Sequence, residues 1–243
     1  MSTPTQTSSF HARLAALKGE LVKQGALVER SIEDAVEAVF EKKADKARIV
    51  IERDTQIDKV DVQIEKNAVQ ILLDEWGQPA ATPPDLRMLL TIVKVNNEFE
   101  RIGDLAVVIA EKFDVIATLP ATGAGAAAVM PPKFRMMANS IIGIMRNTVA
   151  AFDKMDVTSA QLVLASDDAT EAFRTAILRD VEQGLVKGIH GVDYAFALGR
   201  IAYSLGRMAD HCTNVAEQVI YVATGKIVRH EGEKWTRPTD PDA

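Results

Sequence analysis

The chain has 243 residues, of which 47% are hydrophobic and 26% charged, a balance typical of a soluble globular protein. Its formal net charge of −6 argues against a general binder of nucleic-acid phosphates. The single cysteine, Cys212, excludes an intramolecular disulfide and a cysteine-rich zinc site. No apolar run approaches the roughly 20 residues that span a bilayer, so we expect a cytoplasmic protein without direct membrane insertion.

Apolar residues at spacings of three and four predict long amphipathic helices in the first half of the chain. After a polar, frayed start, the first helix is expected from Phe10 to Lys42 and the second from about Lys46 to Trp76. The buried stripe expected on the second helix is Ile51, Ile57, Val60, Ile64, Val69 and Leu72. The segment GQPAATPP at 77–84 breaks this pattern, and a third helix is expected from Asp85 to Thr118.

The composition changes at LPATGAGAAAVMPP (119–132), where Gly, Ala and Pro without periodicity predict a linker. Three further helices are expected at 133–155, 159–187 and 193–224, with a disordered tail after Val228. No stretch alternates with period two for long enough to form a strand. The prediction is therefore an all-α protein of two tandem, pseudo-symmetric three-helix bundles, at 10–118 and 131–228.

The third and sixth predicted helices repeat one another at a constant offset of 106 residues, as from 101 to 207. An offset of this length suits two copies of a three-helix unit rather than a solenoid repeat. The residues that recur are Arg101, Asp104, Ala110 and Glu111, which match Arg207, Asp210, Ala216 and Glu217.

Carboxylates at helical spacing form the candidate site of the first half. Glu100 and Asp104 are four residues apart and share one face of the third helix, as Asp54 and Asp58 do on the second. Asn97 lies one turn before Glu100. If these helices pack as antiparallel neighbours, four carboxylates meet, which is repulsive alone but provides oxygen ligands for a cation. A solvated acidic helix face is the alternative that the spacing leaves open.

The second half keeps fewer carboxylates, because Gly206 stands at the position of Glu100. We expect a metal site here to carry less charge and to bind less tightly. For His211, an exposed or helix-capping role is the alternative to metal ligation. The candidate side chains are Asp167, Asp168, Glu171, Asp210 and His211.

Three stretches resemble the PhoU family of phosphate-transport regulatory proteins. They are QPAATPPDLRMLLTIVKVNNEFERIGDLAVVIAE (78–111), SLGRMADHCTNVAEQVIYVATGKIVRH (204–230) and, more weakly, RDTQIDKVDVQIEKNAVQILL (53–73). The resemblance implies a fold of two symmetry-related three-helix bundles. It also implies acidic E(D)xxxD motifs that bind clusters of iron, zinc or another divalent metal. The positions that match these motifs are Asp54, Asp58, Glu100 and Asp104.

By this resemblance the chain is a non-enzymatic negative regulator of phosphate uptake and phosphate-starvation signalling. The implied partners are the ATPase subunit of a phosphate ABC transporter and a sensor histidine kinase, and a homodimer is expected. The chain has no Glu-x-x-His pair, H-E-x-x-H, G-x-S-x-G or Walker motif to indicate catalysis. Two alternatives remain: a metal-dependent phosphate-ester hydrolase or metal buffer, and a metal-binding accessory protein of another phosphate transporter.

Overall fold

The computed structural model describes residues 4–74, 81–118 and 130–228, which form eight α-helices and no strand. The all-α prediction is confirmed. None of these helices has a stretch long and apolar enough to cross a bilayer. The helices are α1 Pro4–Glu41, α2 Ala44–Asp74, α3 Pro83–Ala110, α4 Phe113–Thr118, α5 Pro132–Lys154, α6 Val157–Leu164, α7 Asp167–Val186 and α8 Val192–Thr224.

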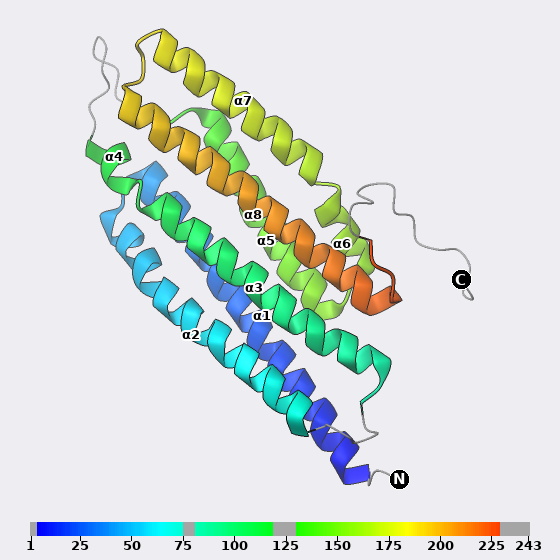
Figure 1. Ribbon diagram of the computed structural model, residues 1–243. Helices are drawn as coiled ribbons and strands as arrows, with labels where there is room; N and C mark the ends of the chain where they lie inside the picture. The colour runs from blue at the N-terminus through cyan, green and yellow to red at the C-terminus, as the bar shows by residue number, and fades with distance from the viewer. Residues whose placement is uncertain (1–3, 75–80, 119–129, 229–243) are drawn as a thin grey trace.

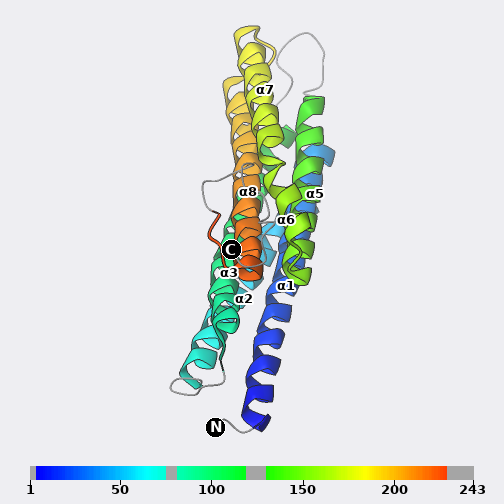
Figure 2. The same ribbon diagram turned by 90° about the vertical axis from the view of Figure 1, so that its right-hand side faces the viewer.

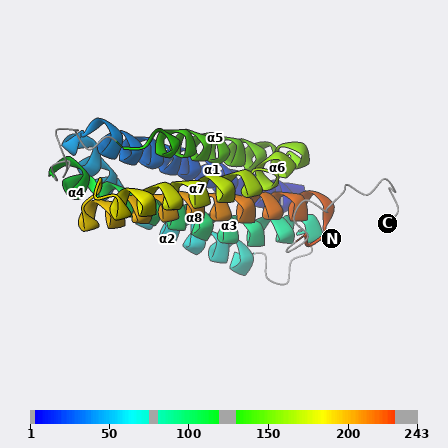
Figure 3. The ribbon, with the colours of Figure 1, turned by 90° about the horizontal axis from the view of Figure 1, so that it is seen from above.

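The long helices lie in two layers, as Figures 1 and 3 show. One layer is the row α2, α3, α8 and α7, in which each helix packs against the next. The other layer contains α1 and α5, which lie side by side and pack against α3 and α8 respectively (Figure 2). Within the described chain, the most extensive contact between helices joins α3 to α8, which run antiparallel. The two halves are thus joined at the centre of the molecule.

The turns explain where the helices begin and end. Thr82 caps α3, its backbone N–H donating to Asp85 Oδ2 at 2.9 Å, and the two prolines that follow suit the first helical turn. Met155, at φ 50°, ends α5, and Asp156 then caps α6 by accepting from the Thr158 N–H at 2.9 Å. Gly225, at φ 74°, ends α8 in the left-handed conformation that glycine adopts without strain.

Several predicted boundaries differ from the observed ones. Helix α1 begins at Pro4, within the stretch that the sequence predicted to be frayed. The predicted third helix is interrupted at Glu111 and Lys112, which separate α3 from α4, and the predicted fifth is interrupted between α6 and α7. Residues 119–129 of the predicted linker, Trp76 and the tail after Val228 lie outside the described residues.

The predicted stripe on α2 is confirmed at its centre, where Ile57 and Ile64 are buried and Val60 is partly buried against the core. Ile51, Val69 and Leu72 were predicted to be buried, but each side chain is more than a third exposed. The core face of α2 uses Ala47, Val50, Ile57, Ile64, Ala68 and Ile71. Two alanines occupy places where α2 packs closely, so a stripe chosen from the largest apolar residues selected the wrong positions at its two ends.

Candidate functional site

Helices α2 and α3 bring five carboxylates together, which we call the first acidic cluster: Asp54, Asp58, Asp61, Glu100 and Asp104. Gly103 allows this close approach. A Cβ atom added at Gly103 would lie 3.3 Å from Ile57 Cδ1 and 3.9 Å from Asp54 Oδ1. The sequence prediction that Asp54 and Asp58 lie beside Glu100 and Asp104 is confirmed.

Burial and mutual repulsion raise the pKa of most carboxyls in this cluster. For Asp54, burial is the larger cause, followed by the charges of Asp58 and Asp104. For Glu100 and Asp104, burial again raises the pKa most, and the neighbouring guanidinium of Arg101 lowers it in part. Each group therefore binds a proton more readily in the folded protein than in the unfolded chain.

The first acidic cluster is poorly neutralised. Arg101 lies 3.5 Å from both Glu100 Oε2 and Asp104 Oδ2, and its side chain is 56% exposed. Asp54 Oδ1 and Glu100 Oε2 are buried without a hydrogen-bond partner. A bound cation would supply the missing charge and partners, so the donor set fits a hard divalent ion. The described side chains nevertheless include no group of three His, Cys, Asp or Glu arranged to hold a metal ion, so binding requires these carboxylates to reorient.

Asp61 and its hydrogen-bond partner Asn96 were not predicted from the sequence to belong to this site. The Asn96 amide on α3 donates to Asp61 Oδ1 at 2.6 Å and to the Asp61 carbonyl at 2.9 Å. Burial, then the charges of Glu65 and Asp58, raises the pKa of Asp61. The signal was the three-residue spacing from Asp58, which places Asp61 on the same helix face one turn later.

Helices α7 and α8 form the corresponding second acidic cluster: Asp167, Asp168, Glu171 and Asp210. Burial raises the pKa of Asp167 most, then the charges of the other three raise it further, while Arg174 lowers it. Unlike the first cluster, this one has close cations. Arg174 Nη2 lies 2.5 Å from Glu171 Oε2, and Arg207 Nη1 lies 2.7 Å from Asp210 Oδ2.

Comparison with known protein families also finds two repeats in this chain. The PhoU domain family matches this sequence twice, at residues 21–113 and 134–219. The chain belongs to the PhoU family. It is 32% identical over 220 residues to the phosphate-specific transport system accessory protein PhoU homolog 1 of Thermotoga maritima, covering 90% of this chain and 91% of that protein. It is 26% identical over 235 residues to the phosphate-specific transport system accessory protein PhoU of Escherichia coli K12, covering 93% and 90%.

Solved structures of PhoU proteins share the fold. The crystal structure of PhoU from Pseudomonas aeruginosa superposes with a TM-score of 0.81 at 25% identity, covering 89% of this chain and all of that one. The phosphate transport system regulatory protein PhoU from Streptococcus pneumoniae superposes with a TM-score of 0.79 at 21% identity, covering 90% of this chain and 99% of that one. The predicted PhoU-like architecture is confirmed.

Two sequence candidates lie elsewhere on this PhoU-family protein, at the junction of α3 and α8. Asn97 lines a polar cavity of about 660 Å³ between these helices, together with Glu98 and Asn214. His211 does not contact the second acidic cluster through a hydrogen bond; its Nδ1 lies 2.7 Å from Glu98 Oε2, which also accepts from Asn214 Nδ2 at 3.0 Å. These hydrogen bonds join the two PhoU repeats.

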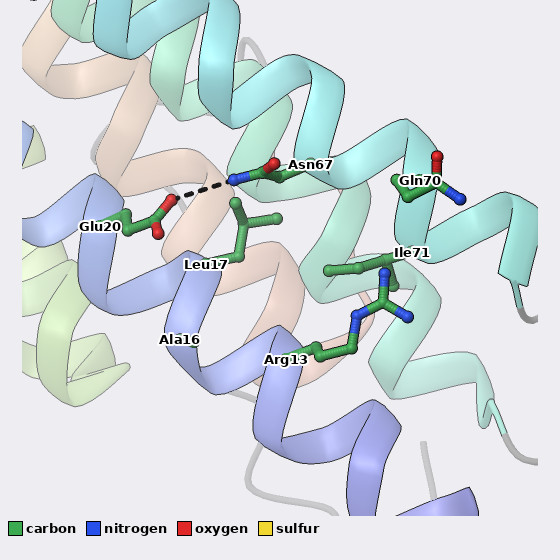
Figure 4. A pocket seen from close by; sticks show the side chains of 7 residues that line it. All are labelled: Arg13, Ala16, Leu17, Glu20, Asn67, Gln70 and Ile71. Atoms are coloured by element: carbon green, nitrogen blue, oxygen red, sulfur yellow. Dashed lines mark hydrogen bonds between the residues drawn. The ribbon is translucent and has the colours of Figure 1, made fainter.

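A second depression lies between α1 of one layer and α2 of the other (Figure 4). Its volume is about 200 Å³, and Asn67 donates to Glu20 Oε2 at 3.3 Å across it. The lining combines two amides, a carboxylate and a guanidinium with the apolar Leu17 and Ile71. It carries none of the carboxylates of the two acidic clusters.

Cys212 is fully buried in α8, and burial raises the pKa of its thiol to about 12. Its Sγ lies 3.9 Å from Met145 Sδ, in the core. A thiol that remains protonated and inaccessible is not a nucleophile.

Proposed function

We propose that this chain is a cytoplasmic accessory protein that negatively regulates phosphate uptake and phosphate-starvation signalling. The observation that carries the proposal is the match to the PhoU family over nearly the whole chain, including relatives named for phosphate-specific transport. The two-layer array of long helices presents broad surfaces, and such surfaces suit protein docking.

The partners in this proposal are the ATPase subunit of a phosphate ABC transporter and a membrane sensor histidine kinase. The outer helices α2 and α7 present exposed apolar side chains suited to such docking, among them Leu73 and Val186, which are 61% and 83% exposed. Burying such side chains against a partner contributes about 25 cal/mol per Å² of apolar surface. In this proposal the chain regulates its partners by binding to them and catalyses no reaction.

The decisive experiment is deletion of the gene in cells that carry a phosphate-responsive reporter. Under phosphate-replete conditions, we expect the reporter to be derepressed and the full-length gene to restore repression. Affinity-tagged protein should recover the transporter ATPase and the sensor kinase from the same cells. A reporter unchanged by deletion, together with neither partner recovered, would contradict the proposal.

The proposal includes a divalent cation at the first acidic cluster, supported by its uncompensated charge and unpartnered oxygens. Iron, zinc and manganese are the ions to test. Equilibrium dialysis should show binding that is lost in the Asp54→Asn/Asp104→Asn variant and retained in Glu52→Gln, which removes an exposed carboxylate elsewhere on α2. Binding that is equal in all three proteins would place the cation elsewhere.

A further inference from the structure

The two acidic clusters differ in charge at three equivalent positions. Helix α2 corresponds to α7 at an offset of 113 residues, as from 54 to 167, which also pairs the core residues Ile64 and Ile177. The same offset places Arg174 at the position of Asp61. The offset of 106 between α3 and α8 places Gly206 at the position of Glu100. At these two positions the second half loses two carboxylates and gains a guanidinium, while Asp168, at the position of Thr55, restores one carboxylate.

The side chain of Arg174 occupies the space that the missing side chain at Gly206 leaves open. A Cβ atom added at Gly206 would lie 2.9 Å from Arg174 Cδ and 3.4 Å from Arg174 Nη1. From this position the guanidinium reaches Glu171 at 2.5 Å, and the Arg174 side chain is only 26% exposed. The glycine on α8 and the arginine on α7 thus fit one another.

The charge of the two clusters differs accordingly. The five carboxylates of the first acidic cluster with Arg101 carry a formal charge of −4. The second acidic cluster holds Asp167, Asp168, Glu171 and Asp210 with Arg174 and Arg207, which gives −2. Two guanidinium groups already offset half of the carboxylate charge there, and that of Arg174 holds a fixed place beside Glu171.

We infer that Arg174 is the resident cation of the second acidic cluster, taking the place that a metal ion would occupy, so that metal binding is confined to the first half. Confinement of metal binding to the first half rests on the proposed function, since that proposal puts a cation at the first acidic cluster. The role of Arg174 as a fixed counter-ion does not depend on it.

The counter-ion role is tested without metal, in chelator. Arg174→Met keeps an unbranched apolar side chain and removes the charge, so the second-cluster carboxylates repel one another at pH 7 and this repulsion fades as they protonate. We expect a melting temperature below wild type at pH 7 and a difference at least halved at pH 4. Arg48→Met, at an exposed pair on α2, is the matched control and should show little difference at either pH. An Arg174→Met deficit that is equal at both pH values would overturn the inference.

The fit of Arg174 to Gly206 is tested by a double-variant cycle. Gly206→Ala should lower the melting temperature in wild type, where the new methyl group meets the arginine stem. In the Arg174→Ala background the same substitution should raise it, because alanine favours a helix over glycine. A Gly206→Ala effect of the same sign in both backgrounds would overturn the proposed fit.

Confinement of metal is tested with Mn²⁺ by equilibrium dialysis on full-length proteins whose helicity is first verified by circular dichroism. Starting from Asp54→Asn/Asp104→Asn, we add Arg174→Asp and Gly206→Glu and expect Mn²⁺ binding to appear in the second half. Absence of any gain, or wild-type binding that is lost only in Asp210→Asn, would overturn confinement. No Mn²⁺ bound by wild type, with a gain in the converted protein, would refute the proposed first site and still support Arg174 as the group that excludes the ion.

Discussion

Two aspartates of the first half show how partners decide the effect of burial on a carboxylate. Burial alone would raise the pKa of Asp34, but hydrogen bonds from Lys46 and Arg53, at 2.6 and 2.7 Å, lower it overall. Asp54 has no such partner, and its pKa is raised. Ionised Asp34 therefore stabilises the folded protein at neutral pH, whereas ionised Asp54 destabilises it.

Removing the charge of Asp54 should stabilise the metal-free protein. Because its folded pKa lies above its unfolded pKa, wild type gains stability from this group as pH falls through that interval and lacks the gain at pH 7. We expect Asp54→Asn to raise the free energy of unfolding by about 0.5 kcal/mol at pH 7 in chelator, measured by urea denaturation. Glu52→Gln is the control; a loss of stability in Asp54→Asn would contradict the interpretation.

Cys212 should be unreactive in the native protein. Because the thiol is buried and its pKa is raised to about 12, we expect no reaction with a chromogenic disulfide reagent at pH 8 and reaction of the one thiol after denaturation. The reaction is measured as released chromophore. Rapid labelling of the native protein would contradict this expectation, because it would show that α8 opens locally far more readily than the burial of Cys212 indicates.

At the scale of elements, Gly25 lets α1 pass close to two neighbouring helices. A Cβ atom added there would lie 2.8 Å from Phe99 on α3 and 2.8 Å from Val149 on α5. We expect Gly25→Ala to lower the free energy of unfolding by about 1–2 kcal/mol, since overpacking exceeds the gain in helix propensity. Gly19→Ala is the control on the same helix, because nothing lies within 4 Å of the added atom. That control should be neutral or stabilised by up to about 1 kcal/mol, and equal effects would contradict the packing argument.

How far the sequence predicted these elements depends on what carries the signal. The face of α3 was predictable because large apolar residues recur at helical spacing, and the pairing of α2 with α3 followed from chain order. The two ends of the α2 stripe were not, since Ala47 and Ala68 contribute to the core through close approach rather than size. Arg174 was missed because the offset of 113 between α2 and α7 appears only when their core residues are aligned.

At the scale of the whole molecule, hydrogen bonds to Glu98 connect the two PhoU repeats. We expect His211→Ala to lower the free energy of unfolding by about 1–3 kcal/mol, because it removes a hydrogen bond to a carboxylate whose side chain is mostly buried. Unfolding should remain a single transition by calorimetry. His11→Ala, at an exposed pair within the first repeat, should cost less. Two separate transitions in wild type would show that the repeats fold independently.

The antiparallel pair α3 and α8 at the centre of the row has a geometric consequence. Turned end over end, the backbone presents a similar row of four helices, so outline alone gives an approaching protein little means of telling one edge from the other. Side chains break that equivalence, because the first acidic cluster with Arg101 carries a formal charge of −4 and the second with Arg174 and Arg207 carries −2. A protein that recognises this rod therefore orients itself by charge rather than by contour.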